Sequence, residues 1–450
     1  MSVQEQELRL SLGSGPVGLD DRPDRLEVIT SADPHPLHER HVLVVGINYA
    51  PEPTGVAPYT VAMAEQFAAQ AASVTVLTGV PHYPSWTIDG GYRRRLRWRE
   101  GTLLDDGSGI LVRRLRHYVP RSQSALTRAT YEATFLVNAW ATKVNPRPSL
   151  IVAVTPSLGG AVAGARLAQR HGSRLLVVVQ DLMAKAACQS GISGGGRVST
   201  ATATLEAYAL RRADRVAVVS DAFRGQLREY GIADDKIVDL PNWTHISPTP
   251  LTRRAAREAL GWPTAPFTVV HTGNIGLKQD LGNLVEAARL CADDANLRFV
   301  IVGAGSQRAT VEGQARGIAN LEFVDPLDKA RYPLSLGAAD VLVVNERPGV
   351  GDMSLPSKLT SYLSSGRPII AAIADGGATA AELCRAGGAA LIAPSGDPAA
   401  LAAGVRRLRD DAALRSGLAA AGRRYAETVL SRTAAMARLD DVVAGCLAGA

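Results

Sequence analysis

Lys278 stands at a position where a single positive charge could do chemistry. It lies in HTGNIGLKQDLGNLVEA (271–287), with Gly273 and Gly276 between a strand-like and a helix-like stretch. Small residues let a backbone approach a diphosphate, and one ammonium group neutralises its charge. The chain has only six lysines beside forty-three arginines, so a lysine at a motif position is informative. The pattern favours an anion site over a solvated surface lysine.

Lys358 is the second lysine of interest, in the segment NERPGVGDMSLPSKLTSYLSSGRPII (345–370). Ser354 can cap a helix that has Pro356 in its first turn and ends at Gly366. Lys358 then sits near the positive end of that helix, where a cation is unfavourable unless an anion is bound. This conflict predicts a phosphate site. The alternative is that the Lys358 side chain turns away into solvent.

Two loops of the first half carry polar or glycine residues after apolar runs. Gln180 and Asp181 follow RLLVVV (174–179), where they could enter a binding site, although Asp181 could instead cap the next helix. Gly55 lies in NYAPEPTGVAPYT (48–60), a proline-stiffened loop before a helix. A substrate or phosphate could rest on that loop, or it could be an ordinary turn. It is not GxGxxG, which disfavours a dinucleotide-dependent dehydrogenase.

Residues 91–128 form an arginine-rich and aromatic segment with ten arginines and three acids. Its candidate contact residues are Arg93, Arg94, Arg95, Arg97 and Trp98. Arginine with aromatics suits an anionic membrane surface or a phosphate-bearing acceptor. The same composition also binds nucleic acid, or could simply reflect the arginine usage of the chain. We favour the membrane or acceptor interpretation because the second half contains no comparable cluster.

The elements that must position these residues are short apolar runs separated by stretches of helical length. This alternation predicts an α/β chain with two doubly wound parallel sheets. The runs are 41–47, 73–78, 110–115, 150–154, 174–179 and 215–220 in the first half, and 267–273, 297–303, 321–324, 341–344, 368–373 and 389–394 in the second. Ligands bind beyond the carboxyl ends of such strands, so we expect the site between two facing domains.

The domain boundaries follow from the same pattern. We expect a flexible leader without apolar periodicity, two Rossmann-like domains joined by a proline-rich linker, and a final helix. These five parts are residues 1–38, 39–240, 241–250, 251–430 and 431–450.

Composition excludes several classes of protein. The chain has 450 residues, 46% of them apolar and 20% charged, enough for a core in each domain. No apolar run reaches the ~20 residues of a spanning helix, and the start shows no secretory signal, so we expect a cytoplasmic protein. Four widely spaced cysteines argue against a disulfide framework and a zinc site.

Seven segments together give the chain a family resemblance. It resembles the GT-B glycosyltransferases of family four, in particular the colanic-acid and O-antigen sugar transferase subgroup. The matching segments are GINYAPEPTGVAPYT, PHYPSW, VVVQDL, KIVDLPNW, HTGNIGLKQDL, VGAGSQR and LPSKLTSYLSSGRPII, in the expected order over residues 41 to 395.

The resemblance implies a GT-B fold, in which two Rossmann-like domains face each other across a cleft. It also implies that residues 39–240 bind the acceptor and that residues 251–430 bind the nucleotide-sugar donor. The implied diphosphate-binding residues are Gly273, Asn274, Gly276, Lys278, Ser357 and Lys358, with Gly55 in the N-terminal loop.

Two departures from the family pattern concern catalysis. Many relatives have two glutamates, with seven residues between them, where Met353 and Ser361 stand here, and Asp352 and Glu346 are the nearby acids. Many also have a histidine at the position of Gln180. The catalytic candidates are therefore Gln180, Asp181 and Asp352.

The implied activity is transfer of a sugar from a nucleoside diphosphate sugar to a hydroxyl of a lipid-linked or polysaccharide acceptor. We expect retention at the anomeric carbon, no metal and no further cofactor, no nucleic-acid partner, and peripheral attachment at the inner face of the plasma membrane. The alternatives are a soluble nucleotide-sugar epimerase and a non-catalytic nucleotide-sugar-binding partner protein.

Overall fold

The structure, a computed structural model, describes residues 35–449 except residue 54 and segments 94–95, 105–107, 122–123, 184–194 and 350–355. Most of the expected leader lies outside the described residues. Leu37, which the sequence assigned to that leader, is fully buried in the core. The packed part of the chain therefore begins before residue 39.

The first sheet has strands in the order β3-β4-β2-β1-β5-β6-β7-β8. Their bounds are β1 His41–Val45, β2 Ser73–Gly79, β3 Arg97–Leu103, β4 Gly109–Leu115, β5 Leu150–Val154, β6 Arg174–Val179, β7 Arg215–Val218 and β8 Ile237–Asp239. β3 pairs antiparallel with β4, whereas the other pairs of this sheet are parallel. The central strands are continuous apolar runs because helices cover both faces.

Helices on each face of the first sheet bury one of two apolar clusters. The larger ones are α1 Ala57–Ala68, α2 Ala125–Trp140, α3 Leu158–His171, α5 Gly195–Arg211 and α6 Arg224–Glu229. Phe135 and Leu167 belong to one cluster, and Met63 and Phe67 to the other. Ser157 caps α3 by accepting the Gly160 amide, which fixes where the chain turns from β5 into that helix.

The second sheet is parallel, in the order β11-β10-β9-β12-β13-β14. Its strands are β9 Phe267–Thr272, β10 Leu297–Val302, β11 Leu321–Val324, β12 Val341–Asn345, β13 Ile369–Ile373 and β14 Ala390–Pro394. Its helices are α7 Arg253–Leu260, α8 Gly282–Leu290, α9 Arg308–Gln314, α10 Tyr332–Ala338, α11 Lys358–Ser365, α12 Ala378–Arg385, α13 Pro398–Asp410 and α14 Ala412–Thr428. Two doubly wound α/β units are thus confirmed.

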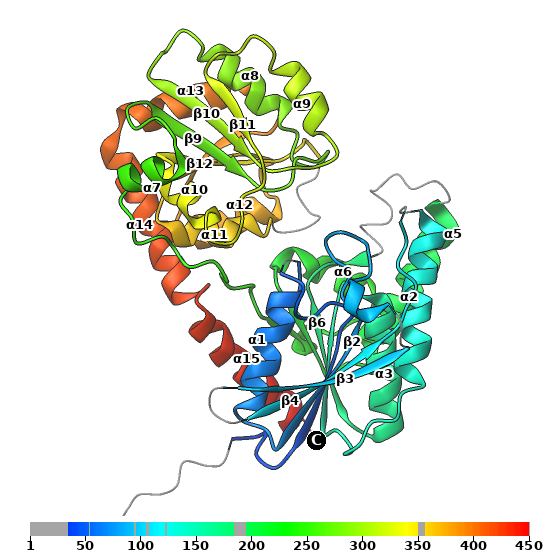
Figure 1. The fold of residues 1–450 in the computed structure, drawn as a ribbon. Helices are drawn as coiled ribbons and strands as arrows, with labels where there is room; N and C mark the ends of the chain where they lie inside the picture. The colour runs from blue at the N-terminus through cyan, green and yellow to red at the C-terminus, as the bar shows by residue number, and fades with distance from the viewer. Residues whose placement is uncertain are drawn as a thin grey trace, which may run out of the picture. The chain divides into compact units, whose positions relative to one another are not determined.

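The last helix returns to the first sheet. α15 (Arg432–Ala448) lies beside α1 (Figure 1), and it buries Met436, Leu439 and Val443 in the same cluster as β1 and β2. Among the described residues, no helix is long and apolar enough to cross a membrane.

Candidate functional site

The candidate donor site lies where the strand order of the second sheet reverses. β10 and β11 extend the sheet on one side of β9, and β12 to β14 extend it on the other. The loops after β9 and β12 leave the sheet at this switch point, which is where open α/β sheets bind ligands. Gly273 begins the first of these loops, and Glu346 begins the second.

The loop after β9 is held rigidly by its neighbours. The Gly273 amide donates to the Val302 carbonyl (2.9 Å), and Asn345 Nδ2 donates to the Gln279 carbonyl (2.8 Å). A Cβ built at Gly303 would lie 1.9 Å from the Gly273 oxygen, so only glycine permits this close approach. The Gly276 amide also has a partner, because it donates to Gln279 Oε1 at 3.2 Å. The glycines of this loop therefore contribute tight backbone packing more than unpaired N–H groups for a ligand.

Lys358 lies at the N-terminus of α11, as the sequence predicted, and it reaches the loop after β9. The helix begins at Lys358, later than a cap at Ser354 implied, and Ser354 itself lies outside the described residues. A Cβ built at Gly273 would lie 3.5 Å from Lys358 Nζ, which places the ammonium against the Gly273 backbone. Ser357 precedes the helix, is exposed, and does not cap it with its side chain. The helix N-terminus and the lysine therefore present positive charge together.

His271 forms a hydrogen bond with the Lys358 ammonium. Its Nδ1 lies 3.2 Å from the Val343 carbonyl oxygen, which can only accept, so Nδ1 carries the proton. Nε2 then accepts from Lys358 Nζ at 3.0 Å. His271 is fully buried, and desolvation together with the charge of Lys358 holds its pKa well below the usual value. It stays neutral and serves as an acceptor.

Burial also lowers the pKa of Lys358, to about 7, while the charge of Glu346 acts in the opposite direction. Glu346 is itself buried, which raises its pKa, and Thr379 Oγ1 donates to its Oε1 at 2.6 Å. Glu346 is thus an acid that acts electrostatically on Lys358. Ser361, at one of the positions where relatives have glutamate, donates its hydroxyl to the Lys358 carbonyl (2.9 Å).

The remaining predicted donor residues lie around this centre. Lys278 and Asn274 are exposed, and the Lys278 carbonyl accepts the Arg347 amide at 2.9 Å. Asn274 Nδ2 donates to Gln279 Oε1 at 3.3 Å. The third catalytic candidate, Asp352, lies outside the described residues.

Gln180 and Asp181 follow β6 and are both half-buried. The Gln180 amide donates to Thr155 Oγ1 (3.0 Å), and Asn242 Nδ2 donates to Gln180 Oε1 (2.7 Å). The side-chain NH₂ of Gln180 is then the group left to face a ligand. Burial raises the pKa of Asp181, while the charge of Lys278 opposes that shift. Among the described residues, Asp181 Oδ1 accepts a hydrogen bond from the backbone amide of Leu182, at 2.9 Å.

The N-terminal loop is anchored by a buried carboxylate that the sequence analysis did not select. Glu52 accepts the backbone amides of His82 (2.8 Å) and Tyr83 (2.9 Å). Gly55 has a φ of 68°, and a Cβ there would lie 3.2 Å from the Tyr83 ring. His82 Nε2 forms a hydrogen bond with Tyr131 Oη (3.0 Å), and both rings belong to a buried aromatic cluster. The segment PHYPSW was the available signal for this anchor.

The arginine-rich segment forms two different faces of the β3–β4 pair. Arg114 is buried and bonds Glu100 (2.8 Å), so it is structural. Trp98, which pairs with Arg114, shares that side of β3, and Arg97 points to the other side. Arg93 is exposed and donates to the Ile88 carbonyl (3.2 Å), while residues 94 and 95 lie outside the described residues.

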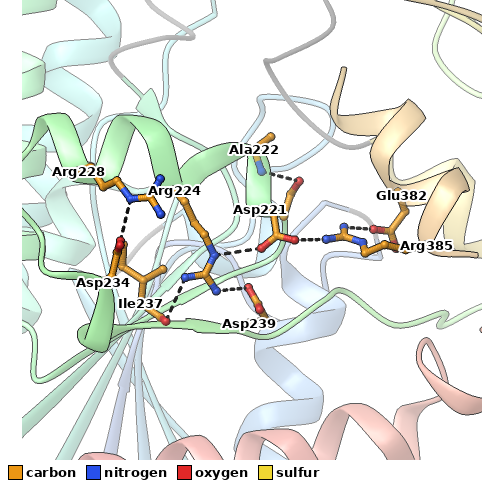
Figure 2. Close-up of polar contacts among 10 residues, drawn as sticks. Asp221, Ala222, Arg224, Arg228, Asp234, Ile237, Asp239, Glu382 and Arg385 are labelled. Carbon is orange, nitrogen blue, oxygen red and sulfur yellow. Dashed lines mark hydrogen bonds and ion pairs between the residues drawn. The ribbon is translucent and has the colours of Figure 1, made fainter. Parts of the chain in front are cut away.

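A polar network runs from α12 to the region after β7 (Figure 2). Arg385 pairs with Glu382 on its own helix and with Asp221, and Asp221 also accepts from Arg224 at 3.0 Å. Arg224 continues the network to Asp239 at 2.7 Å. The same helix carries Thr379, the partner of Glu346, so α12 contacts the candidate site and this network at its opposite ends.

Within the described part of the chain, no cluster of three histidine, cysteine or acidic side chains could hold a metal ion. The geometry instead supplies two lysines, a helix N-terminus and tightly packed glycines. These are groups that bind a diphosphate and stabilise negative charge on it.

Comparisons with known protein families agree with this geometry. Residues 54–243 match the family described as Glycosyl transferase 4-like domain, and residues 266–411 match Glycosyl transferases group 1. The chain is 33% identical to the putative colanic acid biosynthesis glycosyl transferase of Escherichia coli (strain K12), over 72% of this chain and 81% of that protein. It is 29% identical to the phosphatidyl-myo-inositol mannosyltransferase of Mycobacterium leprae (strain TN), over 48% and 56%.

Solved structures share the fold at low sequence identity. The sucrose-phosphate synthase of Thermosynechococcus elongatus superposes with a TM-score of 0.68 at 18% identity, covering 92% of this chain and all of that one. Anabaena HepE, solved in complex with UDP, gives a TM-score of 0.65 at 15% identity, covering 90% and 99%.

Proposed function

Because the chain belongs to the family-four glycosyltransferases of the GT-B fold, we propose that it builds a cell-surface glycan. The reaction moves a sugar from a nucleoside diphosphate sugar to a hydroxyl of a lipid-linked or polysaccharide acceptor. The names of two relatives support this class of product, since one acts in colanic acid biosynthesis and another in lipopolysaccharide core biosynthesis.

The observation that carries the donor proposal is the Lys358 ammonium against Gly273 at the switch point of the second sheet. A lysine with a lowered pKa at a helix N-terminus is poorly stabilised in the empty protein. A diphosphate there would supply the missing negative charge. Lys278, exposed in the same loop after β9, offers a second cation to the diphosphate.

The chemistry follows from where charge develops. Breaking the anomeric bond puts negative charge on the leaving diphosphate, which Lys358, Lys278 and the α11 N-terminus stabilise. We propose retention at the anomeric carbon, with the leaving phosphate accepting the proton of the acceptor hydroxyl. This route needs no strong protein base. It therefore fits the presence of the half-buried side-chain amide of Gln180, which is not a base, after β6. In this scheme Gln180 donates to a sugar hydroxyl or to the acceptor.

The membrane part of the proposal rests on the exposed face of the β3–β4 pair, here called the basic face. Its members are Arg97, Arg99, Leu103, Leu111 and Arg113. Register places Arg99 opposite Arg113, and desolvation, together with the charges of Arg99 and Arg97, lowers the pKa of Arg113. Leu103 is 82% exposed beside these cations. Clustered arginines with exposed leucines suit an anionic lipid surface.

The donor proposal is tested by turnover. The purified chain, a radiolabelled nucleoside diphosphate sugar and a native lipid extract should yield labelled lipid. Donor epimerised without acceptor would favour the epimerase, and donor bound without turnover in any extract would favour a non-catalytic binding protein. A thermal-shift screen of UDP-, GDP- and ADP-sugars chooses the donor first.

The membrane proposal has its own test, co-sedimentation with vesicles of anionic phospholipid at low salt. Each cation near such a surface contributes ~1 kcal/mol, so replacing Arg97, Arg99 and Arg113 with serine should release the protein. A matched triple variant, Arg254→Ser, Arg316→Ser and Arg424→Ser, removes equal charge from exposed positions elsewhere and should still sediment. Equal sedimentation of both variants, or binding of single-stranded nucleic acid in place of vesicles, would contradict the basic face.

A further inference from the structure

A small cavity on the second unit is lined by none of the predicted donor residues, although Ser361, whose hydroxyl donates to the Lys358 carbonyl, is part of its lining. Its volume is about 150 Å³. One wall is the segment joining β8 to α7, including Thr249 and Leu251, and the opposite wall includes Gly366, Arg367 and Arg423. Thr249 packs tightly here, since a Cβ on Gly337 would lie 2.3 Å from its methyl group.

The side chains around this cavity carry more positive than negative charge. Asp340 pairs with both Arg253 and Arg257, and it also accepts the Thr268 amide at 2.7 Å. Its carboxylate is therefore already shared between two arginines. Arg257 is buried and satisfied by carbonyls of the chain, such as that of Ala338 at 2.8 Å. The Asp340 carboxylate is thus taken up by its ion pairs with Arg253 and Arg257. It forms no ion pair, among the described residues, with the arginines that line the cavity.

Arg367 and Arg423 are the two cations that line the cavity. Arg367 donates one N–H to the Gly337 carbonyl (2.5 Å), but its buried Nε has no partner among the described residues. Desolvation and the charges of Arg253, Arg257 and Arg423 lower its pKa, against the opposing charge of Asp340.

Arg423 completes the cationic wall. Its guanidinium packs on Gly366, where a Cβ would lie 2.2 Å from Nη2, and Gly366 has a φ of 64°. In the described part of the chain Arg423 has no acidic partner. The negative end of α11 offsets some of this charge, but only with a partial dipole. Arg367 is half-buried and Arg423 is exposed where they line the cavity, and the planar fork of an arginine guanidinium group matches the oxygens of a phosphate.

We propose that this cavity is a second anion site, which binds a small doubly charged oxyanion of the phosphate type between Arg367 and Arg423. Its volume suits a phosphoryl group and is too small for a nucleoside diphosphate sugar. Because residues 246–251 form one wall, a bound anion would stiffen the segment that joins the two sheets. This site does not depend on the proposed donor or acceptor.

The test is titration of the full chain with inorganic phosphate, by calorimetry and by thermal shift, at constant ionic strength set with chloride. We expect saturable stabilisation of the wild type. Arg423→Ala removes a charged hydrogen bond and should weaken phosphate binding by about tenfold or more. Arg424→Ala, an exposed neighbour on α14 that does not line the cavity, is the matched control and should bind as the wild type.

Two further arms separate this site from the donor site and identify the source of the phosphate. In Lys278→Ala, phosphate binding should persist; its loss there, with Arg423→Ala unaffected, would overturn the proposal. Phosphate giving no more stabilisation than chloride would also overturn it. Glycerol 3-phosphate binding more tightly than inorganic phosphate would identify a phosphorylated metabolite as the ligand, whereas weaker binding would identify free phosphate.

Discussion

Donor affinity should depend on pH through the Lys358 ammonium. Its pKa is lowered to about 7 in the empty chain, mainly by burial. The diphosphate of a nucleotide sugar keeps its charge throughout the neutral range, so Lys358 is the group that changes. As pH rises through 7, Lys358 loses its proton, and the donor must restore it in order to bind.

The magnitude follows from linkage. If only the ammonium form binds, the apparent Kd is multiplied by one plus the ratio of neutral to charged lysine, so it should rise ~10-fold between pH 6 and pH 8. Calorimetry with the nucleoside diphosphate sugar chosen by thermal shift measures this directly. Below pH 6 the affinity should level off, because Lys358 is already charged.

Two variants make the test specific. Lys358→Met should bind the donor weakly and without this pH dependence. Glu346→Gln removes the negative charge that raises the pKa of Lys358, so the fall in affinity should move to lower pH. An affinity that is flat between pH 6 and pH 8 in the wild type, or a slope that survives in Lys358→Met, would refute the reasoning.

Three further predictions concern the loops and the packed start of the chain. Lys278→Ala should weaken donor binding by about 1.5–3 kcal/mol by calorimetry, with partial recovery in Lys278→Arg, because a charged hydrogen bond is lost; unchanged affinity would remove Lys278 from the site. Deleting residues 1–35 should leave turnover and the melting temperature intact, whereas Leu37→Ala should destabilise the chain by ~2–5 kcal/mol in denaturant unfolding. Gly303→Ala should abolish donor binding by displacing the loop after β9, whereas Gly313→Ala, whose Cβ meets open space on α9, should leave donor binding unchanged.

The central strands were the easiest to predict, because their side chains are buried on both faces and they read as unbroken apolar runs. HVLVV (41–45) and LIVAV (150–154) are unbroken apolar runs, and the structure places them at the centre of the first sheet. β3 was not predicted because RWREGTL is an edge strand whose residues alternate between exposed and half-buried. β8 was missed because it has only three residues.

Within the candidate site, the sequence indicated the residues whose type is unusual for their position in a helix or turn. Lys358 conflicts with the helix dipole, and Gly273 interrupts a strand-to-helix turn, so both were found. His271, Glu52 and Asn242 were not selected because their roles depend on contacts between distant segments, such as the 3.0 Å approach of His271 to Lys358. No local pattern encodes those pairings.

The return of α15 to the first sheet has a consequence for synthesis of the chain. The first sheet ends at Asp239, but Met436, Leu439 and Val443, which cover part of it, belong to the last helix. Roughly 200 residues must be translated in between, which takes on the order of 10–40 s at ~5–20 residues per second. During that interval an apolar strip beside α1 stays uncovered on the ribosome-bound chain. We expect this strip to be the surface that chaperones hold, and a chain ending before residue 432 to aggregate when expressed alone.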